Sequence, residues 1–484
     1  MVFSSHIFLF YFLPLALMLY YASPRRVKHL MLTLLSYGFY GWANPAFVVL
    51  LMASTVIDYF CGLVIAGQGL WGRRDPEALA RGGERTRRQR MAVAISVISN
   101  LSLLGFFKYF NFAVENYDGL IRALGLTGLE LDTALRITLP LGISFYTFQS
   151  MSYTIDVYRG HARALRNFTD FSCYVSMFPQ LVAGPIIRFA EVSEQLRSRT
   201  HTLTKFARGV SFLCVGLAKK ILIANPCGKV ADVAFEAGSI GMVDAWVGVI
   251  AYAFQIYFDF SAYSDMAIGL GLMLGFVFPK NFDSPYHARS ITEFWRRWHI
   301  SLSSWLRDYL YIPLGGNRKG PVRTTINLAL VMLLGGLWHG ASWNFVIWGG
   351  IHGVMLGVER ARGRASFYHR LPGVVQVGLT FVLVLITWVF FRAADLPSAL
   401  RYLGSMFGVV GPSEAAPLLA GLMYQPYYML TMGLAAGITW GAPQTWEWTR
   451  RLTGWRIAIT LGLFLLSLLV LATQAFNPFI YFIF

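Results

Sequence analysis

Long apolar runs separated by short polar stretches dominate the pattern of this chain. The first run, FLFYFLPLALMLYY, lies close to the start, a second begins at about Leu30 and breaks at GWANP, and a third ends at about Ile65. Further apolar segments lie near 91–112, 137–157, 209–224, 242–258, 262–278, 324–338, 343–358, 373–391, 420–440 and 456–472. Because a helix needs about 20 apolar residues to cross a bilayer, the pattern predicts an all-α polytopic membrane protein with about eleven transmembrane helices in a single domain, residues 1–484.

Two central segments interrupt this series of spans. Residues 160–208 and 280–323 are rich in Arg and Trp and contain no apolar run of full spanning length. Short apolar pieces such as FSCYVSMFPQLVAGP are typical of re-entrant or interfacial helices. We therefore expect both segments to be re-entrant or amphipathic.

The order of charges sets the expected orientation. No Lys or Arg precedes the first apolar run, and SPRRVKH follows it, which is the reverse of the order in a signal peptide. We expect an uncleaved N-terminus that faces outward. The polar and basic stretch 67–90, GQGLWGRRDPEALARGGERTRRQR, fits a cytoplasmic loop in contact with anionic lipid.

The composition agrees with a membrane protein and gives no indication of nucleic-acid binding, a disulfide framework or a zinc site. The chain is 56% hydrophobic and 13% charged, with a mean hydropathy of +0.52. Its 41 Lys and Arg exceed its 24 Asp and Glu, and this excess of +17 orients helices and meets anionic lipid, so nucleic acid need not be invoked. The four cysteines are scattered without the spacing of a disulfide framework or a zinc site: Cys61, Cys173, Cys214 and Cys227.

The stretch ITEFWRRWHISLSSWLRDYLYIPLGGNRKG, residues 291–320, predicts an amphipathic helix capped by Thr292. One face carries Trp295, Trp298, His299, Leu302, Trp305, Leu306 and Tyr309, and another carries Arg297, Ser301, Ser304 and Asp308. A surface helix whose Arg side chains reach lipid phosphates is the alternative that composition alone favours. His299 is a candidate functional residue because it lies on the aromatic face.

Two carboxylates lie within apolar sequence. The stretch AFQIYFDFSAYSDMAIGLG contains Asp259 and Asp265. Because an acid at membrane depth costs roughly 3 kcal/mol on insertion scales, both should face the protein interior. Pairing with Arg296, Arg297 or His299 would make them structural counter-ions, and a functional role for either acid is the alternative.

The stretch GGLWHGASWNFVIWGGIHG sets two histidines, His339 and His352, in apolar sequence. Thirteen positions at 100° each would put the two rings on nearly opposite faces of one helix, so we expect a break near Gly340 and two helices that direct both imidazoles toward one cavity. An ionisable group inside a bilayer is a functional candidate, although a lone buried His is more often a satisfied core residue. The pair lacks the spacing and the adjacent carboxylate of a metal site. From the residues alone, transport and catalysis both stay open.

Several stretches resemble one known family. FWRRWHISLSSWLRDYLYIPLGGNRKG and MLLGGLWHGASWNFVIWGGIHG resemble the membrane-bound O-acyltransferase (MBOAT) family, and within it the bacterial branch that contains the alginate O-acetylation protein. LPLGISFYTFQSMSYTIDVYRG, FPQLVAGPIIRF, YFDFSAYSDMAIGLGLMLGF and the MVFSS start extend the resemblance over about the first 360 residues. The remainder resembles the family in hydropathy only.

The resemblance implies a shell of helices around a central funnel or tunnel that holds a catalytic histidine. His339, in the LWHG motif of segment 324–358, matches that histidine, and His299, in RRWHIS, matches the family's second functional position. Further candidates for substrate contact are Arg296, Arg297, Trp298, Asp259, Trp338 and His352. Candidates for the phosphates of a donor are Arg296, Arg297, Arg307, Arg318 and Lys319, which fit lipid headgroups equally well.

The resulting hypothesis is a bacterial inner-membrane O-acetyltransferase without a bound metal or cofactor. Its donor substrate is an acyl thioester, acetyl-CoA first, on the cytoplasmic side, and its acceptor is an exported polysaccharide such as alginate, reached through a periplasmic partner protein. A neutral imidazole near pH 7 suits the removal of a hydroxyl proton during this transfer. The alternatives are D-alanyl transfer from a carrier-protein thioester to an envelope polymer, a polysaccharide or lipid-linked sugar transporter, and a catalytically silent scaffold.

Overall fold

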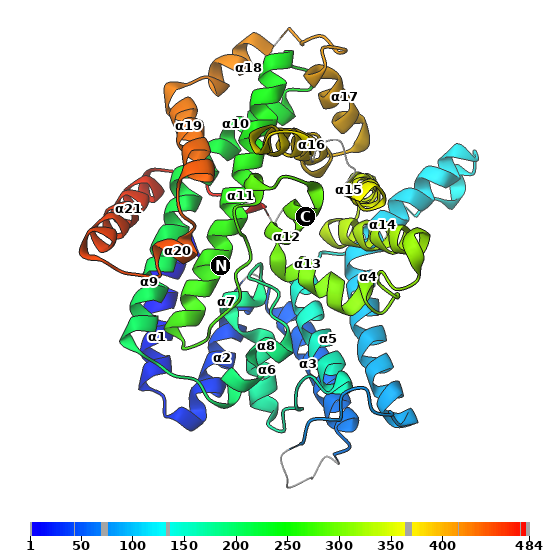
Figure 1. Ribbon diagram of the computed structural model, residues 1–484, viewed down its shortest axis with the longest axis vertical. Coiled ribbons are helices and arrows are strands. Elements are labelled where there is room, and N and C mark those ends of the chain that lie inside the picture. Colours follow the sequence, from blue (N-terminus) through cyan, green and yellow to red (C-terminus); the bar gives the residue numbers. More distant parts are fainter. Residues whose placement is uncertain are drawn as a thin grey trace. The chain divides into compact units, whose positions relative to one another are not determined.

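Helices make up all the regular secondary structure in the described part of the chain. The computed structural model (Figure 1) describes residues 2–42, 44–68, 76–131, 136–363, 370–414, 416–474 and 476–480. The predicted all-α class is therefore confirmed. Residues 69–75 of the predicted basic loop lie outside the described residues, and helix α4 begins at Arg87, before the end of that stretch.

The chain divides into two compact units. The first comprises Met1–Phe206 with Leu270–Phe278, and the second comprises Ala207–Gly269 with Pro279–Phe484. The α-helices of the first unit are α1 (Leu13–Ala22), α2 (Lys28–Gly41), α3 (Pro45–Ile65), α4 (Arg87–Ala123), α5 (Ile143–Arg159), α6 (Phe168–Ser176), α7 (Phe178–Leu181) and α8 (Phe189–Arg197).

The α-helices that lie wholly or mainly in the second unit are α9 (Leu203–Ala218), α10 (Asn225–Glu236), α11 (Met242–Met273), α12 (Ile291–Arg297), α13 (Ile300–Leu306), α14 (Gly320–His339), α15 (Trp343–Arg362), α16 (Gly373–Arg392), α17 (Leu396–Met406), α18 (Ala416–Met423), α19 (Pro426–Gly441), α20 (Thr445–Trp448) and α21 (Gly454–Thr473). Three π-helical turns adjoin α1, α9 and α13: η1 (Ile7–Phe12), η4 (Lys219–Ala224) and η6 (Arg307–Tyr311). The described residues also form the 3₁₀ turns η2 (Arg25–Val27), η3 (Thr127–Leu129) and η5 (Pro285–His287).

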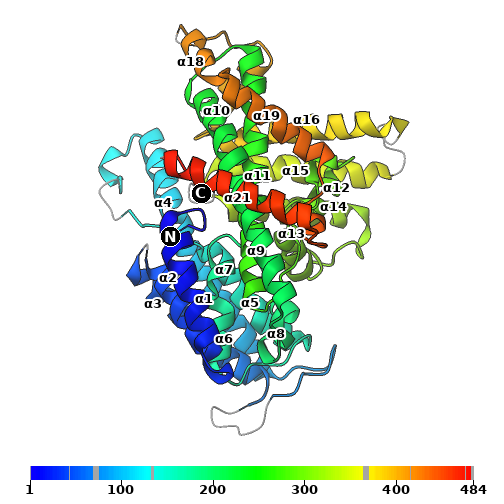
Figure 2. The same ribbon diagram turned by 90° about the vertical axis from the view of Figure 1, so that its left-hand side faces the viewer.

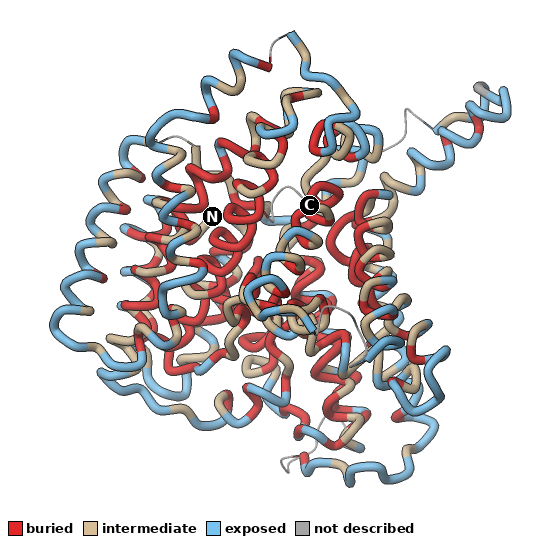
Figure 3. The backbone as a smooth tube through the Cα atoms, turned by 45° about the horizontal axis from the view of Figure 1, so that its top comes forward, coloured by how far each residue is buried: buried red, intermediate tan, exposed pale blue. Residues whose placement is uncertain are grey.

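Five helices in the described part of the chain are long and apolar enough to cross a membrane: α3, α4, α14, α16 and α21. The total of about eleven crossings stays a prediction. Two apolar segments that the pattern separates, 242–258 and 262–278, fall largely on one continuous helix, the 32-residue α11. From Ala251 to Met273 every residue of α11 except Asp265 is buried, whereas Met242 and Val243 at its start are exposed. Figure 3 colours the buried residues red along the chain.

The starts of α3 and α4 follow from local sequence. Asn44 caps α3 by accepting a hydrogen bond from the backbone N–H of Ala46 at 3.0 Å, and Pro45 occupies the first helical position. Thr86 and Gln89 form a capping box at the start of α4. With 37 residues, α4 is roughly 55 Å long and therefore extends beyond a hydrocarbon core of roughly 30 Å.

A polar cluster joins α3, α4 and α5 inside the first unit. Asp58 is fully buried and accepts hydrogen bonds from Ser96 Oγ at 2.6 Å, from Asn100 Nδ2 at 2.7 Å and from Ser150 Oγ. These donors satisfy a carboxyl group that apolar surroundings would otherwise exclude, so the cluster specifies how the three helices pack.

The hairpin of α14 and α15 brings two helix backbones close together (Figures 1 and 2). A methyl group on Gly336 would overlap the carbonyl oxygen of Phe345, and one on Gly349 would overlap the carbonyl oxygen of Met332. Glycine is needed at both positions because a side chain would force the helices apart. The predicted break near Gly340 is confirmed, since α14 ends at His339 and α15 begins at Trp343.

The stretch 291–320 is not the single helix that its periodicity predicts. It folds as α12, α13 and η6, and the residue that caps α12 is Ser290, whose Oγ accepts a hydrogen bond from the backbone N–H of Glu293 at 3.1 Å. The hydroxyl of Thr292 instead donates to Glu359 at 2.6 Å. Glu359 on α15 therefore contacts the first turn of α12.

The interruption between α12 and α13 lies at His299, whose φ of 44° is left-handed. Such a backbone costs about 1–2 kcal/mol for a residue other than glycine. Hydrogen bonds from Ile300 N to the carbonyl of Asn281 and from Asp283 N to the carbonyl of Arg297, each 2.9 Å long, offset that cost. Pairing with the segment 281–283 thus turns the chain at His299.

Candidate active site

A cavity of about 1220 Å³ lies within the second unit, between α12, α13, η6, α14 and α15. Its lining includes one histidine, two tryptophans and three arginines: His339, Trp295, Trp348, Arg296, Arg307 and Arg360. The volume exceeds the roughly 300–1,000 Å³ of ordinary small-molecule pockets, so a long substrate fits.

His339 is the last residue of α14 and borders this cavity while remaining 5% exposed. Its ring lies edge-on to aromatic neighbours, with centroid separations of 5.0 Å to Trp338, 5.2 Å to Phe391 and 5.3 Å to Trp348. The ring of His299 lies 6.4 Å away. The structure therefore brings together the two histidines that the family motifs single out.

The hydrogen bonds of His299 define its tautomer. Its Nδ1 lies 3.3 Å from the side-chain oxygen of Asn281, which can only accept, and 3.4 Å from the hydroxyl of Ser301. We assign the proton to Nδ1 because the Asn281 oxygen is the nearer partner. The same oxygen accepts from the hydroxyl of Ser301 at 2.9 Å. His299 Nε2 is buried without a hydrogen-bond partner among the described residues. In this tautomer the lone pair of Nε2 can accept a hydrogen bond.

Burial also fixes the charge of His299, which lies outside the five candidate spans. Removal from water lowers the pKa of this imidazole to about 3. The ring is consequently neutral throughout the physiological range, and its Nε2 can accept a hydrogen bond. Like His352, His299 is not among the residues that line the cavity.

His352 uses both ring nitrogens within the protein. Its Nδ1 accepts a hydrogen bond from Trp295 Nε1–H at 3.2 Å, so its Nε2–H donates to the Thr387 hydroxyl at 3.2 Å. The ring is fully buried, and His352 is not among the residues that line the cavity. The expectation that both imidazoles of the motif point into one cavity is therefore wrong for His352.

The other predicted contact residues divide between the cavity and its surroundings. Arg296 lines the cavity. Arg297 instead pairs with Glu293 at 2.8 Å, and Trp298 stacks on Phe294 with a centroid separation of 5.5 Å. Trp338 contacts the rings of both site histidines, at 5.0 Å from His339 and 6.0 Å from His299.

Asp259 and Asp265 pair with lysines. Asp259 lies 2.7 Å from Lys220, both side chains being at most 4% exposed, and Asp265 lies 2.7 Å from Lys219. Asp259 also accepts the backbone N–H of Ile480 at 2.8 Å. The predicted partners, two arginines and His299, are wrong, because η4 places adjacent lysines opposite the two acids of α11. The geometry favours the structural alternative for Asp259.

Sequence reasoning missed three residues that shape the site. Asn281 orients His299, Trp348 lines the cavity beside His339, and Glu359 accepts hydrogen bonds from the backbone N–H groups of Ile291 and Thr292 at 2.8 and 2.9 Å. Trp348 lies inside the motif that carries both His339 and His352, which was a usable signal. Nothing local marks Asn281 or Glu359.

Residues suited to metal binding do not gather in the described part of the chain. Within it, no group of three or more His, Cys, Asp or Glu side chains is arranged to hold a metal ion. All four cysteines are free and buried.

Comparison with known proteins identifies the class. The family described as MBOAT, membrane-bound O-acyltransferase, matches residues 159–392. Together with the relatives below, this shows that the chain belongs to that family and is a multi-pass membrane O-acyltransferase.

The names of the relatives describe different acyl transfer reactions. A probable alginate O-acetylase AlgI of Pseudomonas putida is 43% identical, with all of both chains covered. A peptidoglycan O-acetyltransferase of Helicobacter pylori is 37% identical over 85% of this chain and 81% of its own. A teichoic acid D-alanyltransferase of Streptococcus thermophilus is 32% identical over 46% of this chain and 57% of its own.

Proposed function

We propose that this protein is an O-acetyltransferase that moves acetyl from a thioester donor to hydroxyl groups of an exported polysaccharide. The observation that carries the proposal is the imidazole of His339 at the border of a cavity of about 1220 Å³. The relatives named for O-acetylation align with most or all of this chain, which favours acetyl as the group and a polysaccharide as the acceptor. Alginate is the first candidate.

His339 acts as the general base. As the acceptor oxygen attacks the thioester carbonyl carbon, the imidazole takes the hydroxyl proton. The new C–O bond forms, the C–S bond breaks, and the imidazolium returns the proton to the departing thiolate. A positioned base contributes roughly 10² to 10⁴ in rate. The rings of Trp338, Trp348 and Phe391 keep water from the thioester.

His299 is the second functional histidine. With Nδ1 directed to Asn281, its Nε2 accepts a hydrogen bond from a group between the two rings, whose centroids are 6.4 Å apart. Since the neutral ring has no donor at Nε2, we assign it an accepting role and not the stabilisation of an oxyanion.

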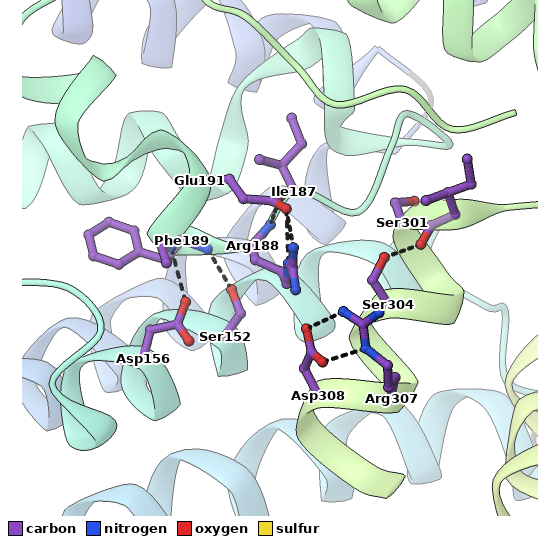
Figure 4. Close-up of polar contacts among 12 residues, drawn as sticks. Ser152, Asp156, Ile187, Arg188, Phe189, Glu191, Ser301, Ser304, Arg307 and Asp308 are labelled. Carbon is purple, nitrogen blue, oxygen red and sulfur yellow. Dashed lines mark hydrogen bonds and ion pairs between the residues drawn. The ribbon is translucent and has the colours of Figure 1, made fainter. Parts of the chain in front are cut away.

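Basic side chains supply the contact for the donor. Arg296, Arg307 and Arg360 border the cavity and suit the phosphates of acetyl-CoA, which we propose as the donor on the cytoplasmic side. Arg307 is also paired with Asp308 at 2.7 Å (Figure 4), so Arg296 is the stronger candidate. The pairing of Arg297 with Glu293 makes that residue a structural one.

The cellular setting follows from this direction of transfer. We propose a bacterial inner-membrane protein with about eleven crossings, a central tunnel that carries the acetyl group outward, and a periplasmic partner that completes delivery to the polymer. D-alanyl transfer stays the alternative, and its relatives align with less than half of the chain. Membership in an acyltransferase family argues against the transporter and the silent scaffold.

The test is the acetate content of exported polymer in cells that carry equal amounts of each membrane-inserted variant. His339→Gln should cut polymer-bound acetate by roughly 10² to 10⁴ because the base is lost while no span is shortened. His299→Ala should also impair transfer, and His352→Ala should be milder. Cys173→Ala, a buried free cysteine of the first unit, is the matched control and should be nearly silent.

Polymer export distinguishes the acetyltransferase hypothesis from the transporter hypothesis. An acetyltransferase variant should still export polymer without acetyl groups, whereas a defective transporter should export none. A normal acetate content in the polymer of His339→Gln cells would refute the role of His339. D-alanine on the polymer in place of acetate would mean that the transferred acyl group is D-alanyl.

A further inference from the structure

Two tryptophans line the cavity, and their indole N–H groups differ. The N–H of Trp295 is engaged, because it donates to His352 Nδ1 at 3.2 Å. The Nε1–H of Trp348 is buried and has no hydrogen-bond partner among the described residues. A buried donor without an acceptor lowers stability, so its retention beside a substrate cavity points to an acceptor that arrives with the substrate.

The indole of Trp348 is held in a fixed position. It stacks on Trp388 at 6.1 Å with an interplanar angle of 15°, and it lies edge-on to Phe391 at 5.1 Å and to His352 at 4.9 Å. Its neighbour in sequence, Gly349, packs directly against the backbone of α14. A donor held this way needs no reorganisation when charge develops near it.

Trp348 also lies next to the proposed base. Its ring centroid is 5.3 Å from that of His339, and the two planes are nearly perpendicular at 86°. A carbonyl under attack beside His339 is therefore within the neighbourhood of this indole. Three of the hydroxyls that line the same cavity donate within the protein: those of Ser303, Ser304 and Thr292 donate to Trp298 O, Ile300 O and Glu359.

We propose that Trp348 Nε1–H donates a hydrogen bond to the carbonyl oxygen of the acyl thioester and to the oxyanion that forms from it. This assignment rests on the proposed acetyl transfer at His339. When the acceptor oxygen adds to the carbonyl carbon, the carbonyl π electrons move to oxygen and the indole stabilises that negative charge. They return to the carbonyl as the C–S bond breaks, and the thiolate leaves with the proton from His339.

The kinetic test replaces Trp348 with 3-benzothienylalanine, which keeps the bicyclic shape and substitutes sulfur for N–H. Trp348→Phe is the encoded second variant, and Trp246→Phe is the control, because the N–H of Trp246 donates to Met406 O at 3.0 Å away from the cavity. With acetyl-CoA as donor, both Trp348 variants should lose roughly 10² to 10³ in kcat with little change in acetyl-CoA affinity. A loss of affinity with unchanged kcat would overturn the assignment.

The spectroscopic test reads the bond directly. Purified full-length His339→Gln protein binds acetyl-CoA labelled with ¹³C at the carbonyl, and difference infrared spectroscopy measures its C=O stretch. The stretch should lie at lower frequency than in free acetyl-CoA and should return toward the free value when Trp348 carries the benzothienyl side chain. If acetyl-CoA binds and its C=O stretch is the same with the tryptophan and with the benzothienyl side chain, the role of Trp348 is overturned and the proposed function is not. Failure of the unmodified protein to bind acetyl-CoA would refute the proposed donor and, with it, this inference.

Discussion

At the scale of single residues, the three histidines of the second unit differ in how their ring nitrogens are used. His352 donates and accepts within the protein and so holds Trp295 in place. His299 donates from Nδ1 and keeps Nε2 open. His339 borders the cavity. The three side chains are identical, but their neighbours differ, so they suit the structural, supporting and catalytic roles that we propose for them.

The buried neutral state of His299 predicts a pH-dependent stability. The pKa is about 3 in the folded protein and about 6.5 in the unfolded chain, so below pH 6.5 the unfolded state binds a proton that the folded state does not. Stability contributed by this difference is present above pH 6.5 and is lost as the pH falls toward 3. Between pH 6.5 and 5 the wild type should lose roughly 2 kcal/mol more unfolding free energy than His299→Gln. Denaturant unfolding in detergent at both pH values measures the unfolding free energy of each protein. Equal losses in the wild type and in His299→Gln would contradict the prediction.

At the scale of helices, the α14–α15 hairpin determines the position of the site. Its glycines let the backbone of α15 approach α14, which brings Trp348 beside His339 at a centroid separation of 5.3 Å. Loosening that contact would move the two site residues relative to each other even though neither is changed.

Two adjacent glycines of α15 provide a matched test of this packing. A methyl group on Gly349 would overlap the carbonyl oxygen of Met332, whereas one on Gly350 would lie 3.7 Å from Leu333 Cδ2, an ordinary contact. Gly349→Ala should destabilise the protein by about 1–3 kcal/mol and reduce transfer. Gly350→Ala should be neutral or stabilise by up to about 1 kcal/mol, since alanine favours helix. Thermal unfolding and polymer acetate measure both, and equal effects would contradict the role of Gly349.

At the scale of the whole molecule, buried polar groups tie together elements that are distant in sequence. Asp58 joins α3, α4 and α5 in the first unit, and the pair of Lys220 and Asp259 joins η4 to α11 in the second. Such groups specify packing among helices whose apolar surfaces would otherwise fit in several ways.

The pair of Lys220 and Asp259 can be tested by a double-mutant cycle. Lys220→Met should destabilise by roughly 3–5 kcal/mol, because it leaves a buried carboxylate without its cation, and adding Asp259→Leu should restore much of that loss. Acetylation by the double variant should follow its stability. A double variant that is stable but inactive would instead support the substrate-binding role predicted for Asp259.

The sequence by itself determined the helical class, the membrane setting, the family, the break near Gly340 and the motifs that hold His299 and His339. These features depend on hydropathy, glycine placement and neighbouring residues, which are local properties of the chain. Tertiary structure alone decided the turn at His299, the lysine partners of the acids and the separate environments of the histidines. Each of these depends on a partner distant in sequence, such as Asn281, Lys220 or Thr387, whose proximity exists only after the helices pack.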